Sequence, residues 1–419
     1  MRRIVTVSLT ALLLGSAASA QVCDPLVESM QIAAQTAPEV SVAEARVQRA
    51  EADLVEARSL RRPQLSTFGR SGVGDTGLTS NQFDNQLGLR LSQRVFDFGD
   101  ARFAIDSAEY QRQRLVFDQA SAEAQAAYAL GSAYLAAQEA RGRMTVIAER
   151  REYYARQLAA VEALLARGGA TRAERAQIAA QLAEADAVML ELRSQEQRAG
   201  ARVEAYLGRP AGLCGDEQTA AALADRLDDL QTADQALDAV MQGNPRMDAT
   251  RSNIRSLEAQ RERERRSRLP VVDVVGISSY TYDDAREDWD YRDRIGVDVS
   301  VPILTGNALG ARADRAEAVL EEEEYTLRQL QRDLREQGSV VFRRLLSLRA
   351  QQVQREAVAS SQREYFEAIS GEFEFGLGTL PDLVEARLDY ERAMLDLVAV
   401  EFELKRQQLD LMLLTSRLP

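Results

Sequence analysis

The feature of this sequence that most constrains its fold is an internal duplication with a spacing of about 207 residues. Prolines and glycines recur at that spacing in both halves, and a helix break recurs at nearly the same one. The matched pairs are Pro38 with Pro245, Pro63 with Pro270, Gly99 with Gly306, and Thr171 with Thr379. Two copies of one unit, residues 21–215 and 216–419, therefore make up the chain after residue 20.

Each unit predicts the same order of elements: a helix, a strand hairpin, a long helix, a break and a last helix. The first helix, 39–61 or 246–268, carries no internal proline or glycine and ends before a proline, as helices tend to. In the first copy the other elements are strands 63–70 and 83–96, a long helix 100–166, a break 167–173 and a last helix 172–207. In the second copy they are strands 270–282 and 291–304, a long helix 307–375, a break 375–381 and a last helix 380–416.

The strand candidates alternate between apolar and polar residues. The apolar positions are Phe83, Leu87, Leu89, Leu91 and Val95 in the first copy, and Ile295, Val297, Val299, Val301 and Ile303 in the second. This pattern indicates a half-buried sheet, or a barrel wall with lipid outside and water inside. The aromatic residues Tyr280, Tyr282, Trp289 and Tyr291 favour an interfacial girdle, with simple packing of the hairpin as the alternative.

The helical segments carry apolar residues at a period of seven. One such stripe is Leu320, Leu327, Leu334, Val341 and Leu348, and another is Leu383, Tyr390, Leu397, Leu404 and Leu411. A sustained spacing of seven indicates left-handed supercoiling against neighbouring helices. At about 1.5 Å per residue, the helix over 307–375 would be about 100 Å long, far beyond an ordinary globular domain.

The first twenty residues predict export. Arg2 and Arg3 precede a short apolar run, Ile4 to Leu14, and Ala18-Ser19-Ala20 forms a small-residue cleavage site, which is typical of a signal peptide. The run is too short for a membrane anchor. Export permits a disulfide between Cys23 and Cys214. The alternative, a lipidated Cys23, is disfavoured because Val22 precedes it, where a small residue is usual, and because it would leave Cys214 unpaired.

Composition excludes several classes of function. The formal net charge of −13 argues against nucleic acid as a partner. The chain has no histidine, and it shows no phosphate-binding loop, metal-ligand cluster or catalytic constellation. An enzyme is therefore not expected, and no cofactor or metal is expected either.

Four strands per chain cannot close a barrel, and an open strand edge in lipid leaves backbone groups without hydrogen bonds. Several chains must then contribute to one barrel. Three chains would supply twelve strands, an even number in the workable range. The same three chains would supply twelve helical columns that continue the barrel as a tube.

The order and duplication of three motifs resemble those of the TolC-type outer-membrane channel family. The motifs are LRRPQLSTFG with its echo SRLPVVDVVG, SQRVFDFGDA with its echo SVPILTGNA, and FGLGTLPDLVEARLDYERAMLDL. The resemblance implies a mainly helical homotrimer, with a 12-stranded β-barrel in the outer membrane continuous with a 12-helix tunnel across the periplasm. It also implies a passive exit duct that docks to a periplasmic adaptor protein and an inner-membrane transporter of the ABC or RND type.

In that architecture the two helix breaks are the turns at the periplasmic tip, formed around Gly168 and Gly169 in the first copy and around Gly376, Gly378 and Thr379 in the second. By resemblance, Asp382, Glu385 and Glu174 are the constriction acids, and threefold symmetry turns each into a ring that favours cations. The competing interpretation is that acids just after a break cap the helix N-terminus and match its dipole.

The resemblance also implies a closed state held by an arginine and an aromatic residue near the second break. Here the arginine position is Gly378 and the aromatic is Phe373. Because Gly378 stands in place of that arginine, the hydrogen bonds that usually hold the closed state are not expected. Arg167 or Arg172 is the candidate to take over the role of the arginine.

An export channel for secreted proteins or for small toxic compounds is the favoured function. The alternative is a coiled-coil scaffold of the cell envelope that forms no channel, which the membrane-length strands argue against. The sequence leaves the cargo open, because a passive duct carries little substrate chemistry.

Overall fold

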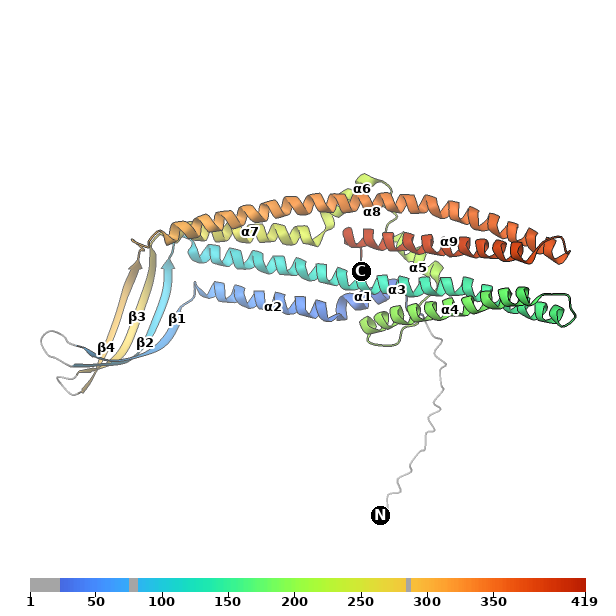
Figure 1. Cartoon of the computed structure of the whole chain (residues 1–419). Coiled ribbons are helices and arrows are strands. Elements are labelled where there is room, and N and C mark those ends of the chain that lie inside the picture. The colour runs from blue at the N-terminus through green and yellow to red at the C-terminus, as the bar shows by residue number, and fades with distance from the viewer. Residues whose placement is uncertain (1–22, 75–81, 284–287) are drawn as a thin grey trace, which may run out of the picture.

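The computed structural model describes residues 23–74, 82–283 and 288–419. The predicted signal peptide, residues 1–20, lies outside these ranges. The molecule is long and narrow, with a β-sheet at one end and two helical hairpin tips at the other (Figure 1). No helix within the described ranges has an apolar stretch long enough to cross a bilayer.

The sheet has four antiparallel strands in the order β1-β2-β3-β4, so β1 and β4 are its two free edges. The strands are β1 Gln64–Gly74, β2 Gln82–Phe96, β3 Val271–Asp283 and β4 Asp288–Ser300. The central β2–β3 pair joins the two repeats. Apolar side chains on one face are exposed, among them Leu65, Leu87 and Ile295.

Three strand ends differ by at least three residues from those predicted from the sequence. The prediction that the fourth strand begins at residue 291 is wrong, because β4 begins at Asp288, which pairs with Asp283. The prediction that the fourth strand extends to residue 304 is wrong, because Ser300 already pairs with Val271, the first residue of β3. Beyond Ser300 there is no partner, and Pro302 has no N–H to donate. The prediction that the first strand ends at residue 70 is also wrong, since β1 pairs with β2 as far as Gly74.

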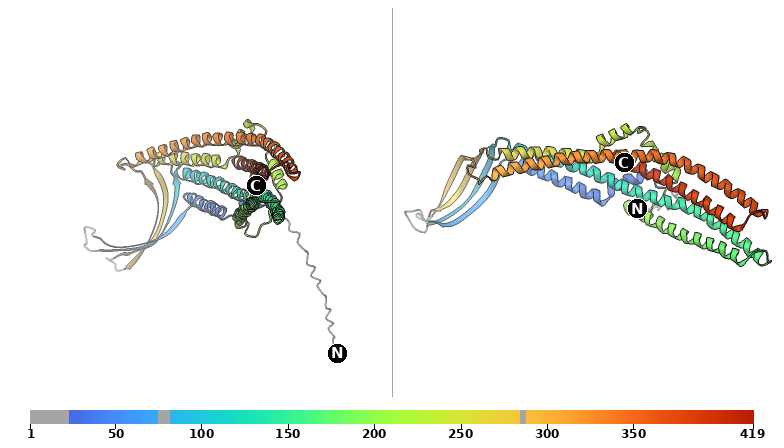
Figure 2. Two further views of the ribbon diagram at one scale, coloured as in Figure 1. Left: turned by 45° about the vertical axis from the view of Figure 1, so that its right-hand side comes forward. Right: turned by 45° about the horizontal axis from the view of Figure 1, so that its top comes forward.

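Four helices run away from the sheet (Figure 1). These are α2 Pro38–Ser59, α3 Asp100–Leu165, α7 Pro245–Arg266 and α8 Ala308–Glu374. Neighbours in the order α2, α3, α7, α8 pack against one another, and both views in Figure 2 show them side by side as a curved wall. At about 1.5 Å per residue, α3 and α8 are each about 100 Å long.

Two further helices complete hairpins at the far end. They are α4 Arg172–Leu207, which packs along α3, and α9 Leu380–Leu414, which packs along α8. Arg172 and Ala173 are already helical, as are Leu380 and Pro381, so the predicted breaks 167–173 and 375–381 each extend two residues too far, whereas the predicted helix starts at 172 and 380 are confirmed. The helices begin there because Thr171 and Thr379 act as N-caps, and a proline is tolerated in the first turn.

Three short helices surround the middle of the molecule, and the sequence patterns did not predict them. They are α1 Leu26–Thr36, α5 Asp216–Asp225 and α6 Ala233–Gly243. The helices α1 and α6 occupy matching places in the two repeats, each directly before a proline that begins the next helix. At the spacing of 207, α5 would correspond to residues 9–18, which lie outside the described residues.

The main core lies at this middle level, where α1, α5 and α6 cover the wall. Met30, Leu130, Tyr134, Leu409 and Met412 are among its fully buried side chains. Close approach of α1 and α9 to α3 requires a glycine at one point. A Cβ on Gly131 would lie 2.8 Å from the Sδ atom of Met30 and 3.1 Å from a Leu409 methyl group.

A disulfide joins Cys23 to Cys214 across a sequence separation of 191 residues. It belongs to a wider attachment of the N-terminal segment. The backbone N–H of Asp24 donates to Gly212, the Arg209 guanidinium binds the Asp24 carboxylate at 2.5 Å, and the Tyr134 hydroxyl donates to the Asp24 carbonyl at 2.8 Å. The same hydroxyl accepts from the N–H of Cys214, so one buried tyrosine binds both ends of the bridge.

Replacing both cysteines, Cys23→Ser with Cys214→Ser, should lower the stability of the detergent-solubilised protein. Removing a disulfide that closes a long loop typically costs about 2–5 kcal/mol. The urea-unfolding midpoint measures the effect. The reductant dithiothreitol should lower the midpoint of the native protein and leave that of the double variant unchanged. Equal midpoints for the native and double-variant proteins would contradict this role.

Candidate functional site

The two tip turns have the same backbone structure. In the first, Gly168 has φ +77° and the N–H of Gly169 donates to the carbonyl of Leu164 at 2.9 Å. In the second, Gly376 has φ +75° and the N–H of Leu377 donates to Glu372, also at 2.9 Å. A positive φ at this position is available mainly to glycine. The repeat therefore extends to the hydrogen bonds of the turns.

Each turn ends in a threonine cap with an acid three residues later. The Thr171 hydroxyl accepts from the N–H of Glu174 at 3.1 Å, and the Glu174 carboxylate accepts from the N–H of Thr171 at 2.7 Å. These backbone and hydroxyl hydrogen bonds lower the pKa of Glu174 below its ordinary value. In the second turn, the Thr379 hydroxyl donates to the Asp382 carboxylate at 2.5 Å. Capping thus accounts for the position of Glu174 and, in part, of Asp382.

Asp382 and Glu385 lie on the first two turns of α9, and both are exposed, whereas Leu383 and Val384 between them are buried. Their spacing of three residues places the two carboxylates on the same exposed face of α9. Glu174 lies at the start of α4 in the other hairpin, and its carboxylate, like that of Asp382, is bound by the capping threonine. One chain therefore supplies two acids in helix caps, Glu174 and Asp382, together with the exposed Glu385 at the tip.

Phe373 is half-buried against α9 and packs in a small tip core with Leu380, Leu383 and Tyr154. A Cβ on Gly378 would lie 3.3 Å from the backbone nitrogen of Phe373, so a larger residue there would press on the turn. Arg167 and Arg172 are exposed. Within the described part of this single chain, neither comes within 4 Å of a carboxylate, so their role in closing the tip stays a prediction.

The second turn also exposes two large apolar side chains. Phe375 is 84% exposed and Leu377 is 81% exposed. The corresponding first turn reads Arg167-Gly168-Gly169 and carries no such pair. The two hairpin tips therefore differ in chemistry although their backbones match.

About 10 Å from the second turn, a charged cluster lies buried between the two hairpins. Arg387 on α9 is 7% exposed and donates from Nε to Glu391 at 2.8 Å, and Glu391 is 2% exposed. The other Glu391 oxygen lies 3.4 Å from Nε of Arg150 on α3. The Arg387 guanidinium also contacts the rings of three aromatic residues, Tyr153, Phe366 and Tyr390.

The cluster joins three helices through one cation. Its rings come from α3, α8 and α9, so the Arg387 side chain binds the first hairpin to both helices of the second. Burial raises the pKa of the Glu391 carboxyl, against the lowering effect of the neighbouring Arg387 and Arg150. Removing one partner from such a group leaves an uncompensated buried charge. Its place between the hairpins makes this cluster a determinant of their relative position.

Sequence reasoning missed this cluster because Arg387 and Glu391 look like an ordinary exposed pair, four residues apart on a helix. One signal was available. Arg387 lies within the apolar stripe that runs from Leu383 to Tyr390, where a charged residue is unusual.

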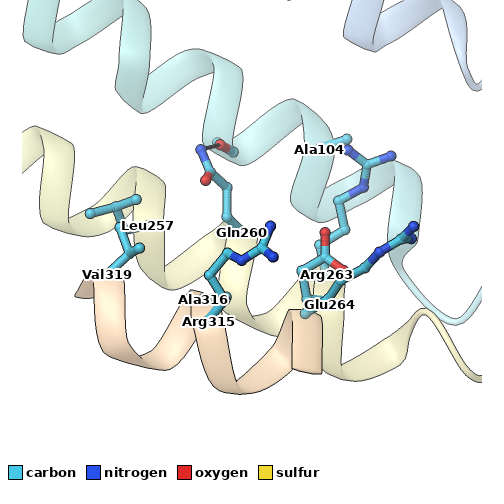
Figure 3. Close-up of a pocket in the computed structure, with 10 residues that line it drawn as sticks. Ala104, Leu257, Gln260, Arg263, Glu264, Arg315, Ala316 and Val319 are labelled. Atoms are coloured by element: carbon cyan, nitrogen blue, oxygen red, sulfur yellow. Dashed lines mark hydrogen bonds between the residues drawn. The ribbon is translucent and has the colours of Figure 1, made fainter. Parts of the chain in front are cut away.

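A groove of about 460 Å³ lies at the other end of the wall, where α3, α7 and α8 meet near the sheet (Figure 3). Arg263, Arg315 and Gln260 line it together with Leu257 and Val319. Its serine and glutamine are already engaged. Ser107 binds the hydroxyl of Ser256 at 3.0 Å and accepts from the side chain of Gln260 at 3.1 Å. These hydrogen bonds join α3 to α7, so the groove is part of the packing interface between neighbouring helices of the wall.

Replacing Arg387 by methionine should destabilise the full-length protein by on the order of 3 kcal/mol, because Glu391 then loses its closest partner in a buried site. The matched control is Arg363→Met. Arg363 and Glu367 form the same kind of pair, four residues apart, but are 66% and 60% exposed, so its loss should cost far less stability. Urea-unfolding midpoints of the solubilised variants measure both. Similar midpoints for the two would show that burial does not matter here.

Comparison with known proteins gives consistent matches over most of the chain. The family model described as "Outer membrane efflux protein" matches residues 30–209 and 219–417. The outer membrane efflux protein BepC of Brucella suis biovar 1 (strain 1330) is 25% identical over 354 residues, which cover 83% of this chain and 75% of BepC.

Solved structures show the same fold. The outer membrane protein VceC of Vibrio cholerae superposes with a TM-score of 0.77 at 16% identity, over 93% of this chain and 95% of VceC. The outer membrane channel CmeC of Campylobacter jejuni gives 0.77 at 14% identity, over 94% of this chain and 85% of CmeC. Since the family model also covers most of the chain, this protein belongs to the outer membrane efflux protein family, whose members lie in the outer membrane and extend into the periplasm.

Proposed function

We propose that three copies of this chain form one passive exit duct that spans the periplasm and opens through the outer membrane. The observation that carries the proposal is the four-stranded sheet with two free edges, directly continued by helices about 100 Å long. A sheet placed in lipid must pair both edges. Joining β4 of one copy to β1 of the next, three times around, supports a closed wall of twelve strands.

The tip of the proposed duct carries its selectivity. Asp382 and Glu385 are exposed on the same face at the start of α9, and threefold symmetry would repeat each of them three times around one axis. Rings of carboxylates at a narrow point favour cations and repel anions. Glu174 has its carboxylate engaged by its own helix cap, so we assign it a smaller share in this selectivity.

The duct would act with two partners, a periplasmic adaptor protein and an inner-membrane transporter of the ABC or RND type. The exposed pair Phe375 and Leu377 supports docking at the tip, because exposed apolar groups at a molecule's extremity favour contact with another protein. Both protein secretion and efflux of small toxic compounds fit a passive duct. The similarity to BepC, an outer membrane efflux protein, favours the second.

The acid rings can be tested by conductance in planar lipid bilayers. The native protein should conduct, prefer cations over anions and be blocked by divalent cations added on the periplasmic side. The double variant Asp382→Asn with Glu385→Gln should lose most of the cation preference and the block, since six carboxylates leave the constriction of the trimer.

The control removes the same number of charges away from the tip. Glu28→Gln with Glu217→Gln alters exposed residues of α1 and α5 and should leave selectivity unchanged. Unchanged selectivity in the tip variant would refute the acid-ring assignment. Absence of any conductance from the native protein would instead favour the alternative, an envelope scaffold without a channel.

A further inference from the structure

The strand register separates the side chains of the sheet into two faces. On the apolar face, the rows that cross from β1 to β4 are Thr67–Leu89–Ser278–Asp293, with Gly69–Leu87–Tyr280–Tyr291 on one side and Leu65–Leu91–Gly276–Ile295 on the other. Ile295, Val297 and Val299 are 85%, 62% and 62% exposed. In the proposed duct this face meets lipid, and Asp293 is the β4 residue on it that breaks the apolar pattern.

Asp293 does not lie at the margin of the apolar face. The row above it contains Leu87, Tyr280 and Tyr291, and the row below contains Leu91 and Ile295. The Asp293 carboxylate is exposed on the face that meets lipid in the proposed duct. Charged side chains on the lipid face of a barrel are destabilising unless they are paired or covered.

Across the described ranges, no hydrogen bond or ion pair reaches the Asp293 side chain. Its neighbour across the strand pair, Ser278, is engaged with the Tyr291 hydroxyl at 3.0 Å. Arg294 and Arg292 point to the opposite face, because successive strand residues alternate. A partner must therefore come from beyond the free edge of β4.

In a closed ring, the element beyond β4 is β1 of the next copy. Alternation requires that Asp293 lie opposite a β1 residue on the same face, and the described candidates are Leu65, Thr67, Gly69, Ser71 and Val73. The three central ones, Thr67, Gly69 and Ser71, are small, and two of them carry hydroxyl groups. The β1 edge thus presents small and hydroxyl-bearing residues where the β4 edge presents a carboxylate.

We propose that Asp293 lies opposite the Thr67–Gly69–Ser71 segment of a second copy of this chain, and that hydroxyl groups of this segment hydrogen-bond its carboxylate. The proposal rests on the ring of copies proposed above and names the contact that sets the register between them. A shift of one residue would bring the other face of β1 against Asp293. The polar contact therefore favours registers of β4 against β1 of the next copy that keep Asp293 opposite this segment.

The hydroxyl groups are available for this contact. Thr67 now donates to the backbone carbonyl of Gly88 at 3.2 Å, and Ser71 donates to the side chain of Asn85 at 2.6 Å. Rotation about one side-chain bond redirects either proton across the edge. Hydrogen bonds to a charged acceptor are stronger than those to neutral ones, so the carboxylate of the next copy is the better acceptor.

Cysteine cross-linking tests the alignment. Asp293→Cys is combined in turn with Thr67→Cys, Gly69→Cys and Ser71→Cys in the full-length protein, whose own two cysteines are already bridged. Residues directly opposite on antiparallel strands lie close enough for a disulfide. On oxidation, at least one pair should give dimers and trimers on non-reducing gels that dissociate on reduction. The control pair, Asp293→Cys with Arg70→Cys, should give none, because Arg70 is on the other face.

The outcomes separate this contact from the ring itself. Suppose that chemical cross-linkers fix the native protein as a trimer, but Asp293→Cys forms no disulfide with Thr67→Cys, Gly69→Cys or Ser71→Cys, or forms one only with a further variant, Leu65→Cys. This result overturns the contact and leaves the ring. A native protein that is not a trimer overturns both.

A second measurement tests the hydrogen bonds. Asp293→Leu should lower the temperature at which the trimer dissociates in detergent, because Thr67 or Ser71 loses its acceptor in an apolar setting. The control Val297→Leu, two rows away on the same face, should leave that temperature unchanged. A higher dissociation temperature for Asp293→Leu would show an uncovered carboxylate facing lipid, and would contradict the proposal.

Discussion

The structure depends on one constraint, the need to pair the backbone groups at the two edges of a four-stranded sheet. β1 and β4 each present a row of N–H and C=O groups without partners. In water such edges invite association, and in a bilayer they must be satisfied. The sheet order places the two edges at opposite sides of one chain, so a ring of copies satisfies all of them with a single repeated contact. The long helices then follow the ring as the wall of a tube.

Two kinds of packing hold the helical part in register with the sheet. Around the middle, the short helices and the Cys23–Cys214 bridge attach the N-terminal segment to α3 and α9 through a dense apolar core. Near the tip, apolar packing is thinner, and the buried Arg387–Glu391 pair with its aromatic neighbours joins the two hairpins. The net free energy of a buried ion pair depends more strongly on the distance and orientation of its groups than that of an apolar contact does. In the proposed duct this pair would lie at the end of the tunnel where the relative position of the hairpins sets the opening.

Much of this fold could be predicted from local signals in the sequence. The 22-residue helices α2 and α7 lie within two residues of their predicted ends, because Pro38 and Pro245 begin them and a proline follows each of them closely. The turns were visible as glycine followed by a capping threonine. The faces of the strands followed from alternation, and only the ends of β1 and β4 required knowledge of where the partner strand stops.

What could not be predicted depends on contacts between distant segments. The pair Arg387–Glu391 has the same spacing as the exposed pair Arg363–Glu367, and only the tertiary structure distinguishes the buried one. The acids at the tip were predicted by resemblance, and the structure adds that Glu174 is engaged by its own cap while Asp382 and Glu385 remain exposed. The helices α1, α5 and α6 are 11, 10 and 11 residues long, too short for an apolar period of seven to repeat.

The most direct test of the central claim is the number of chains in the detergent-solubilised particle, measured by native mass spectrometry. Edge pairing between copies predicts particles of three chains. Particles of a single chain that keeps its sheet would contradict the account.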